Sequence, residues 1–227
     1  MKLFFHFCPS SFSNCYLLGT DSPPGEPALS MEASPPMEAS PPMEASPPME
    51  AVIIDPGNMD STVLGLIERN NYILRGILLT HDHPHHIRGL KTIMRIYDTE
   101  IFAINPEIME YRSNLVKDGD IINIGPFRTE VISIPGHSAD SAVYRIDRLL
   151  FTGDTLSAGL LGRTASSYAA ATQASALRNK LFSLPGDYTV LPGHGPPSSL
   201  EAERRFNLDL NSLQGPGDRR PSFRIDY

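Results

Sequence analysis

The stretch Thr80-His81-Asp82-His83-Pro84-His85-His86 holds four of the seven histidines of this 227-residue chain within six positions. Pro84 disfavours helical geometry at His83, which predicts an extended, curled loop over His81 and His83. On such a loop the two side chains can converge on one metal ion. A purely structural role would have to pack four imidazoles together with nothing between them, so the pattern indicates a metal site.

The second half of this motif is expected to begin a helix. His85 and His86 precede a segment, 87–97, whose pattern predicts a helix. The positive end of the helix dipole disfavours imidazolium at that position. Both rings are therefore expected to be neutral and able to bind a metal.

Three further motifs supply side chains of the same kind. Each directly follows an apolar stretch that predicts a strand, just as the first motif follows the apolar stretch Ile77–Leu79. Side chains that leave several strand ends can meet at one edge of a sheet, where a rigid scaffold holds a site on its loops. The motifs are Gly136-His137-Ser138, Gly153-Asp154 and Pro192-Gly193-His194-Gly195.

In order and spacing these motifs resemble the ligand motifs of the metallo-β-lactamase superfamily. The segments Leu161–Thr164, Leu177–Leu184 and Glu203–Asn207 are similar to its short bacterial type II glyoxalase (hydroxyacylglutathione hydrolase)-like branch. The resemblance covers nearly all of residues 2–212 except a repeat described below. It implies an α/β fold, a four-layer αββα metallo-β-lactamase sandwich with the metals at one edge between the sheets.

The resemblance also implies a ligand set. In the family pattern the first metal is held by the residues that match His81, His83 and His137. The second is held by those that match His86 and His194 together with an aspartate, and Asp154 bridges both ions. The cofactor expected from this pattern is one or two divalent ions, zinc first, with iron and manganese as alternatives.

The sequence departs from that pattern at His85, which stands where the family has the aspartate, and at Arg88, which replaces a glycine. His85 can donate a ring nitrogen but brings no negative charge. The site is then one unit more positive than usual, which favours an anionic substrate and weakens retention of the second ion. One bound metal and two bound metals both remain open.

The expected reaction is hydrolysis by metal-bound hydroxide, because a bound metal acidifies water and polarises the carbonyl under attack. By resemblance the substrate is a hydroxyacyl thioester, a small anionic molecule, and Arg163 is the candidate that binds its carboxylate. Too few residues follow His194 for the helical domain with which longer glyoxalases grip glutathione. The resemblance therefore does not identify the thiol to which the acyl group is attached.

Two alternatives compete with hydrolysis. Persulfide dioxygenases of the superfamily hold one iron with the residues that match His81, His137 and Asp154, and the weakened second site keeps that activity open. The other alternative is a non-catalytic metal-binding protein whose site has drifted. Six retained ligands argue against drift, because a structural site needs only about four.

Composition excludes several other classes. Lys and Arg total 19 against 26 Asp and Glu, and a net charge of −7 speaks against nucleic acid as a partner. No apolar run approaches the roughly 20 residues of a membrane span, so no membrane partner is expected. Two cysteines, Cys8 and Cys15, suggest a reducing compartment and a cytoplasmic location. The sequence does not indicate an oligomeric state.

A repeat interrupts the expected domain. The hexapeptide Met-Glu-Ala-Ser-Pro-Pro occurs three times from residue 31 to residue 48, and residues 22–50 contain nine of the 21 prolines. Such a segment lacks the apolar side chains of a core, so 22–50 is predicted to be a disordered insertion. The organisation expected is one metallo-β-lactamase-like domain over 1–212, with that interruption, and a carboxy-terminal tail over 213–227.

The remaining pattern mixes strands and helices throughout, which predicts packed layers of both. A helix is expected to start with Ser61 or Thr62 as its cap and to end near Arg69. The other helices are expected over 173–184 and 200–210. Strands are predicted at 1–8, 12–19, 51–54, 77–79, 101–103, 121–122, 127–134, 142–146, 149–152 and 188–191.

Overall fold

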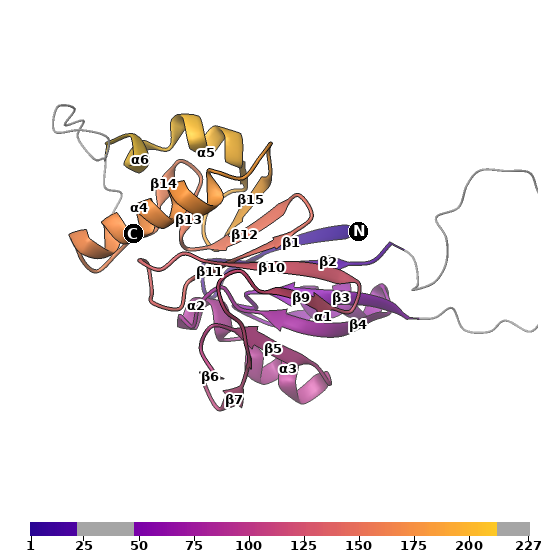
Figure 1. The fold of residues 1–227 in the computed structure, drawn as a ribbon. Coiled ribbons are helices and arrows are strands. Elements are labelled where there is room, and N and C mark those ends of the chain that lie inside the picture. Colours follow the sequence, from indigo (N-terminus) through magenta and orange to yellow (C-terminus); the bar gives the residue numbers. More distant parts are fainter. Residues whose placement is uncertain (22–47, 213–227) are drawn as a thin grey trace, which may run out of the picture.

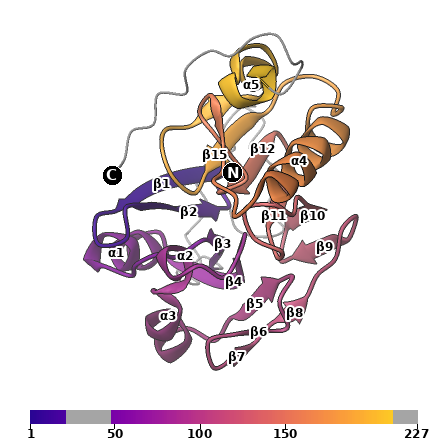
Figure 2. The same cartoon turned by 90° about the vertical axis from the view of Figure 1, so that its left-hand side faces the viewer.

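The computed structural model describes residues 1–21 and 48–212 of the chain. Two six-stranded sheets pack face to face, and each carries helices on its outer side (Figure 1). The helices α4, α5 and α6 lie beside one sheet, and α1 and α3 lie beside the other (Figure 1); the view turned by 90° shows α4 and α5 on one side and α1 and α3 on the other (Figure 2). This arrangement confirms the four-layer αββα sandwich expected from the sequence.

The first sheet has the strand order β1-β2-β3-β4-β5-β8. It begins as an antiparallel meander of β1, β2 and β3, and it continues with parallel pairs from β3 to β8. The strands are β1 (Lys2–Cys8), β2 (Ser13–Gly19), β3 (Met49–Ile54), β4 (Tyr72–Leu78), β5 (Glu100–Ala103) and β8 (Asn114–Leu115).

The second sheet has the strand order β16-β15-β12-β11-β10-β9 and is antiparallel except for the pair β12–β15. Its strands are β9 (Ile121–Ile124), β10 (Phe127–Ser133), β11 (Ala142–Ile146), β12 (Leu149–Gly153), β15 (Thr189–Pro192) and β16 (Ser198–Ser199). Two short ribbons accompany the sheets, β6 (Glu107–Ile108) with β7 (Tyr111–Arg112) and β13 (Leu156–Ser157) with β14 (Leu160–Leu161).

Three buried clusters follow the layers. Val63 and Ile93 of the helices pack with Ile53 on the outer face of the first sheet. The inner faces of the two sheets meet around Tyr16, Tyr144 and Phe151, and helical residues such as Leu177 cover the outer face of the second sheet. The helices are α1 (Ser61–Arg69), α2 (Pro84–Ile87), α3 (Leu90–Ile96), α4 (Ser167–Ala176), the π-helix η1 (Leu177–Leu181), α5 (Leu200–Phe206) and α6 (Leu208–Ser212).

The structure corrects several predicted boundaries. Asp60, and not Ser61 or Thr62, caps α1, because its carboxylate accepts hydrogen bonds from the first-turn amides. The helix expected to run to Tyr97 is two helices, α2 and α3, separated at Arg88 and Gly89. Met49 and Glu50, assigned to the insertion by the sequence, are the first residues of β3. The rest of the repeat, 22–47, and the tail, 213–227, lie outside the described residues.

None of the helices in the described ranges 1–21 and 48–212 has the length and apolar character needed to cross a membrane.

Candidate metal centre

Four loops from the two sheets meet at one edge of the sandwich. The first follows β4 and carries His81, His83 and His86, and the other three follow β10, β12 and β15 of the second sheet. His83 has extended backbone, with φ −66° and ψ 143°, before Pro84 begins α2. The curled loop predicted from the proline is therefore present, and it directs the side chains of His81 and His83 towards each other.

His81, His83 and His137 form the first cluster of possible metal ligands. His83 Nδ1 lies 3.0 Å from His81 Nε2 and 3.0 Å from His137 Nε2. His81 is buried, whereas the other two side chains are partly exposed. The three ring nitrogens thus converge on one point that remains open to solvent on one side.

Asp154 connects this cluster to a second one, formed by His81, His86 and Asp154. Asp154 Oδ2 lies 3.4 Å from His86 Nε2 and 3.6 Å from His137 Nε2, so the carboxylate faces both groups of imidazoles. Its Oδ1 lies 2.7 Å from His194 Nδ1. His194 therefore reaches the centre through Asp154, although it belongs to neither cluster of three.

Hydrogen bonds behind the rings turn three of the imidazoles towards the centre. His86 Nδ1 lies 3.1 Å from Asp55 Oδ2, and His81 Nδ1 lies 3.1 Å from Thr80 Oγ1. His137 Nδ1 donates to the carbonyl oxygen of Arg163 at 2.8 Å. In each ring Nδ1 is bound behind the ring and Nε2 faces the centre, which is the orientation usual for metal-bound histidines.

Asp55 is the residue of the centre that the sequence did not single out. It is 2% exposed and directly follows β3. Its carboxylate accepts hydrogen bonds from the amide and the hydroxyl of Thr80 at 2.8 and 2.6 Å, besides its contact with His86. The sequence feature that could have identified Asp55 is an aspartate directly after a buried apolar strand.

Burial and neighbouring charges shift the pKa values of the three rings in different directions. Burial, with help from the neighbouring His86, lowers the pKa of His81 to about 2, and burial also lowers the pKa of His137. Burial lowers the pKa of His86 too, but the carboxylates of Asp55 and Asp154 outweigh it and raise that pKa to about 10. The helix-dipole argument predicted the opposite direction for His86, so it was wrong about the dominant influence on that ring.

The side chains present fit a divalent cation. His86 Nε2 is fully buried and has no hydrogen-bond partner among the described residues, although Asp154 faces it. A buried ring nitrogen without a partner is costly unless something binds it. A cation between His86 and Asp154 would satisfy both groups, and imidazole with carboxylate is a donor set that suits zinc, iron and manganese.

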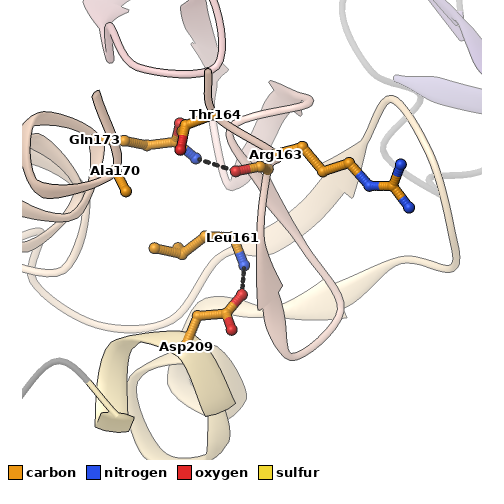
Figure 3. Close-up of a pocket in the computed structure, with 7 residues that line it drawn as sticks. Leu161, Arg163, Thr164, Ala170, Gln173 and Asp209 are labelled. Atoms are coloured by element: carbon orange, nitrogen blue, oxygen red, sulfur yellow. Dashed lines mark hydrogen bonds between the residues drawn. The ribbon is translucent and has the colours of Figure 1, made fainter. Parts of the chain in front are cut away.

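His85 and Arg163 lie differently from the other predicted site residues. The His85 side chain is exposed, and its ring centroid is 5.9 Å from that of His194, so it stands at the rim and in neither cluster. Arg163 is exposed and contributes its carbonyl, not its guanidinium, to the contact with His137. Figure 3 shows the guanidinium directed away from the side chains of Leu161 and Gln173, which line a cavity of about 300 Å³.

The comparisons with known proteins agree with the fold and the clusters. The family described as the metallo-beta-lactamase superfamily matches residues 47–194. An uncharacterised protein of Mycobacterium tuberculosis is 30% identical over 199 residues, which cover 72% of this chain and 88% of that protein. Hydroxyacylglutathione hydrolase GloC of Haemophilus influenzae is 28% identical over 188 residues, covering 71% and 88%.

Solved structures give the same architecture at lower identity. The BLEG-1 B3 metallo-beta-lactamase superimposes with a TM-score of 0.73 at 22% identity and covers 92% of this chain and 99% of its own. ETHE1 from Myxococcus xanthus superimposes with a TM-score of 0.71 at 23% identity, covering 96% and 93%. The matched family, the 30% relative and the His and Asp clusters agree, and this chain belongs to the metallo-β-lactamase superfamily.

Proposed function

We propose that this chain is a metal-dependent hydrolase that cleaves a hydroxyacyl thioester of a small anionic thiol. The observation that carries the proposal is the inward-facing Nε2 of His81, His86 and His137, each held by an acceptor behind its ring, around the single carboxylate of Asp154. His83 and His194 add further donors. Five histidines and one aspartate are more ligands than a structural site requires.

At such a centre some residues of the chain would bind the ions and others would hold those ligands in place. His81, His83 and His137 would hold one divalent ion, zinc first, and His86 and His194 would hold a second ion that shares Asp154 with the first. When bound, such ions polarise a carbonyl and make water acidic enough to attack it near neutral pH. Asp55 and Thr80 would keep His81 and His86 in their tautomers and so maintain the geometry through turnover.

The substrate class is supported by the relatives and by the charge of the centre. The Haemophilus influenzae relative named hydroxyacylglutathione hydrolase GloC aligns with 71% of this chain over 88% of its own length. Asp154 is the one carboxylate in the two clusters of possible ligands. A centre with few negative ligands attracts an anionic substrate, and the exposed Arg163 side chain offers a partner for its carboxylate.

The direct test uses the full chain loaded with zinc, manganese or iron. Release of free thiol from an S-(2-hydroxyacyl)glutathione is followed with a thiol-reactive dye, and Asp154→Asn serves as the inactive control. We expect metal-dependent thiol release that the control lacks. Equal thiol release by the native chain and the control, or none with any of the three metals, would overturn the proposal.

A second candidate is oxygenation of a thiol persulfide at a single iron. Asp154 Oδ2 lies 3.8 Å from His81 Nε2 and 3.6 Å from His137 Nε2, which is the donor set of the two-histidine, one-carboxylate iron centres that activate oxygen. Oxygen uptake by the iron-loaded chain with glutathione persulfide, and no thiol release from the thioester, would favour this activity over hydrolysis.

A further inference from the structure

Gln173 is a fully buried amide in a helix of small residues. It is the seventh residue of α4, at the end of the second turn, and is 0% exposed. Helix α4 contains five alanines and packs against the second sheet through Ala176, which is followed by the buried Leu177 of η1. A long polar side chain inside such a layer costs free energy unless its hydrogen bonds compensate for the lost water.

The amide of Gln173 joins two loops of the metal centre. Its Nε2 donates to the carbonyl oxygen of Thr155 at 2.8 Å and to that of Gly162 at 3.3 Å (Figure 3 draws the second bond). Thr155 directly follows Asp154, and Gly162 directly precedes Arg163, whose carbonyl accepts the hydrogen bond from His137. One side chain therefore ties the peptide next to the shared carboxylate to the peptide next to the acceptor behind His137.

Gln173 also touches the loop that carries His137. Gly136 has φ +147°, a conformation open mainly to glycine, and a Cβ there would lie 2.4 Å from Gln173 Cβ. The loop therefore packs directly on the helix at this residue. Of the three loops that the second sheet contributes to the centre, the two that carry His137 and Asp154 both contact Gln173.

The amide nitrogen of Gln173 is hydrogen-bonded, but its amide oxygen is not. Gln173 Oε1 is buried and has no hydrogen-bond partner among the described residues. An unpaired buried acceptor destabilises a fold, and an apolar side chain of the same length would avoid that cost. Packing alone therefore favours leucine or methionine at this position, and the two bonds from Nε2 are what an apolar side chain would lose.

We propose that Gln173 is a positioning residue for the metal centre, acting through the peptides of Thr155 and Gly162 to set the distance between Asp154 and His137. The proposal rests on the metal centre of the proposed function. It predicts that removing the amide loosens metal binding without weakening the fold. A residue with a merely structural role would show the reverse.

The test compares Gln173→Met and Gln173→Leu with Leu177→Ala in the full chain. Methionine keeps the unbranched shape and the length, and leucine provides a second apolar variant. Leu177 is 0% exposed and belongs to the buried cluster on the outer face of the second sheet, so its truncation opens a cavity in that cluster. Zinc affinity is measured by competition with a chromogenic chelator, and the ligand field by the absorption spectrum of the cobalt-loaded protein.

We expect Gln173→Met and Gln173→Leu to bind zinc about 10- to 100-fold more weakly, the range found when residues behind metal ligands are removed. Their cobalt spectra should change, and their metal-free melting temperatures should equal or exceed the native value. Leu177→Ala should melt earlier and keep the native zinc affinity and cobalt spectrum. Native affinity and an unchanged spectrum in either soluble Gln173 variant would overturn the proposal, and so would a melting temperature that falls as far as in Leu177→Ala.

These measurements use no substrate. A native chain that binds zinc but hydrolyses no thioester would count against the proposed function and leave the role of Gln173 to be judged from the affinities. A native chain with no affinity for zinc or cobalt would overturn both.

Discussion

Asp154 Oδ1 and His194 Nδ1 lie 2.7 Å apart, across the parallel pair of β12 and β15. Gly153 at the end of β12 is paired with Pro192 at the end of β15, so the residues that follow both strands emerge at the same edge of the sheet. Burial raises the pKa of Asp154, but the hydrogen bond with His194 and the neighbouring His86 outweigh burial and hold that pKa well below its usual range. The carboxylate is therefore negatively charged at any physiological pH.

Replacing Asp154 by asparagine should abolish the centre. The amide keeps the size of the side chain but removes the negative charge and one of its acceptor oxygens. We expect most bound metal to be lost and thioester turnover to fall by at least about 100-fold. Elemental analysis and thiol release measure the two effects. Asp82→Asn is the matched control, because the Asp82 carboxylate accepts from Asn105 and not from a ligand. Near-native metal content and rate in Asp154→Asn would contradict the bridging role.

Gly193 should tolerate no side chain. A Cβ at this position would lie 2.4 Å from His86 Cε1 and 2.5 Å from Asp154 Oδ1, so Gly193→Ala must displace one of the two groups. We expect loss of metal binding in a folded protein. Gly195→Ala is the control, because no atom lies within 4 Å of its added Cβ and only its φ of +82° is strained. That variant should lose about 1 kcal/mol of stability and keep its metal. Equal metal contents in the two variants would argue that the Gly193 contact can relax.

The cap of α1 gives a prediction for the pH dependence of stability. Asp60 Oδ1 accepts from the amides of Thr62 and Val63 at 2.9 and 3.1 Å, and its Oδ2 lies 2.9 Å from His6 Nε2. Burial raises the pKa of Asp60, but these hydrogen bonds and the neighbouring His6 outweigh it and lower that pKa. The folded state therefore favours the charged form more than the unfolded state does.

The resulting stabilisation is fully present above about pH 3.9, the unfolded value, and is lost as the pH falls below it through the lowered folded value. Asparagine can still cap the helix but cannot carry the charge. We expect Asp60→Ala to lose about 1 kcal/mol at pH 7. Asp60→Asn should lose less, and its deficit should shrink below about pH 4. Urea unfolding from pH 3 to pH 7 measures this, and a deficit in Asp60→Asn that is independent of pH would contradict the explanation.

The sequence predicted the strands and loops of the centre because each motif is contiguous and directly follows an apolar strand. His81, His83, His137, Asp154 and His194 all follow a strand end, and the resemblance in motif order implied that they meet at one edge of the sandwich. The two-residue strands β6, β7, β8, β13, β14 and β16 were missed because two residues carry no periodicity. The helix over 87–97 was predicted as one because nothing local reveals that Gly89 packs against Pro56, where a Cβ would lie 2.5 Å from the carbonyl oxygen.

The residues behind the ligands could not be predicted for a different reason. Asp55 acts on Thr80 and His86 over 25 and 31 residues of sequence, and Gln173 acts on Thr155 and Gly162 through their carbonyl groups. Backbone acceptors are present at every position, so no residue type marks them. Such contacts depend on how two sheets and a helix pack, which a single sequence does not state.

Arg163 should affect the substrate and not the metal. Its carbonyl holds His137, and this contact survives any substitution of the side chain. The guanidinium is exposed and free to meet an anionic group. We expect Arg163→Ala to keep native metal content and to raise KM for the thioester several-fold with little change in kcat. Arg163→Lys should recover part of the loss, because it restores the charge without the planar fork. A loss of metal in Arg163→Ala would show that the side chain also supports the loop.

His85 stands where the family pattern has an aspartate, and the structure places its exposed ring beside His194 and outside both clusters. A side chain that holds no ion can be removed without losing one, so His85→Ala should bind as many metal ions as the native chain. His85→Asp adds a negative charge next to His194 and should hold the second ion through dialysis against chelator concentrations that strip it from the native chain. Elemental analysis at graded chelator concentrations measures both, with His6→Ala as a control for losing a histidine far from the centre. If His85→Ala lost one ion, the ring would have to turn inward and act as a ligand. If His85→Asp gained nothing, the second position would be unable to hold a divalent ion, which would favour the single-iron oxygenation over thioester hydrolysis.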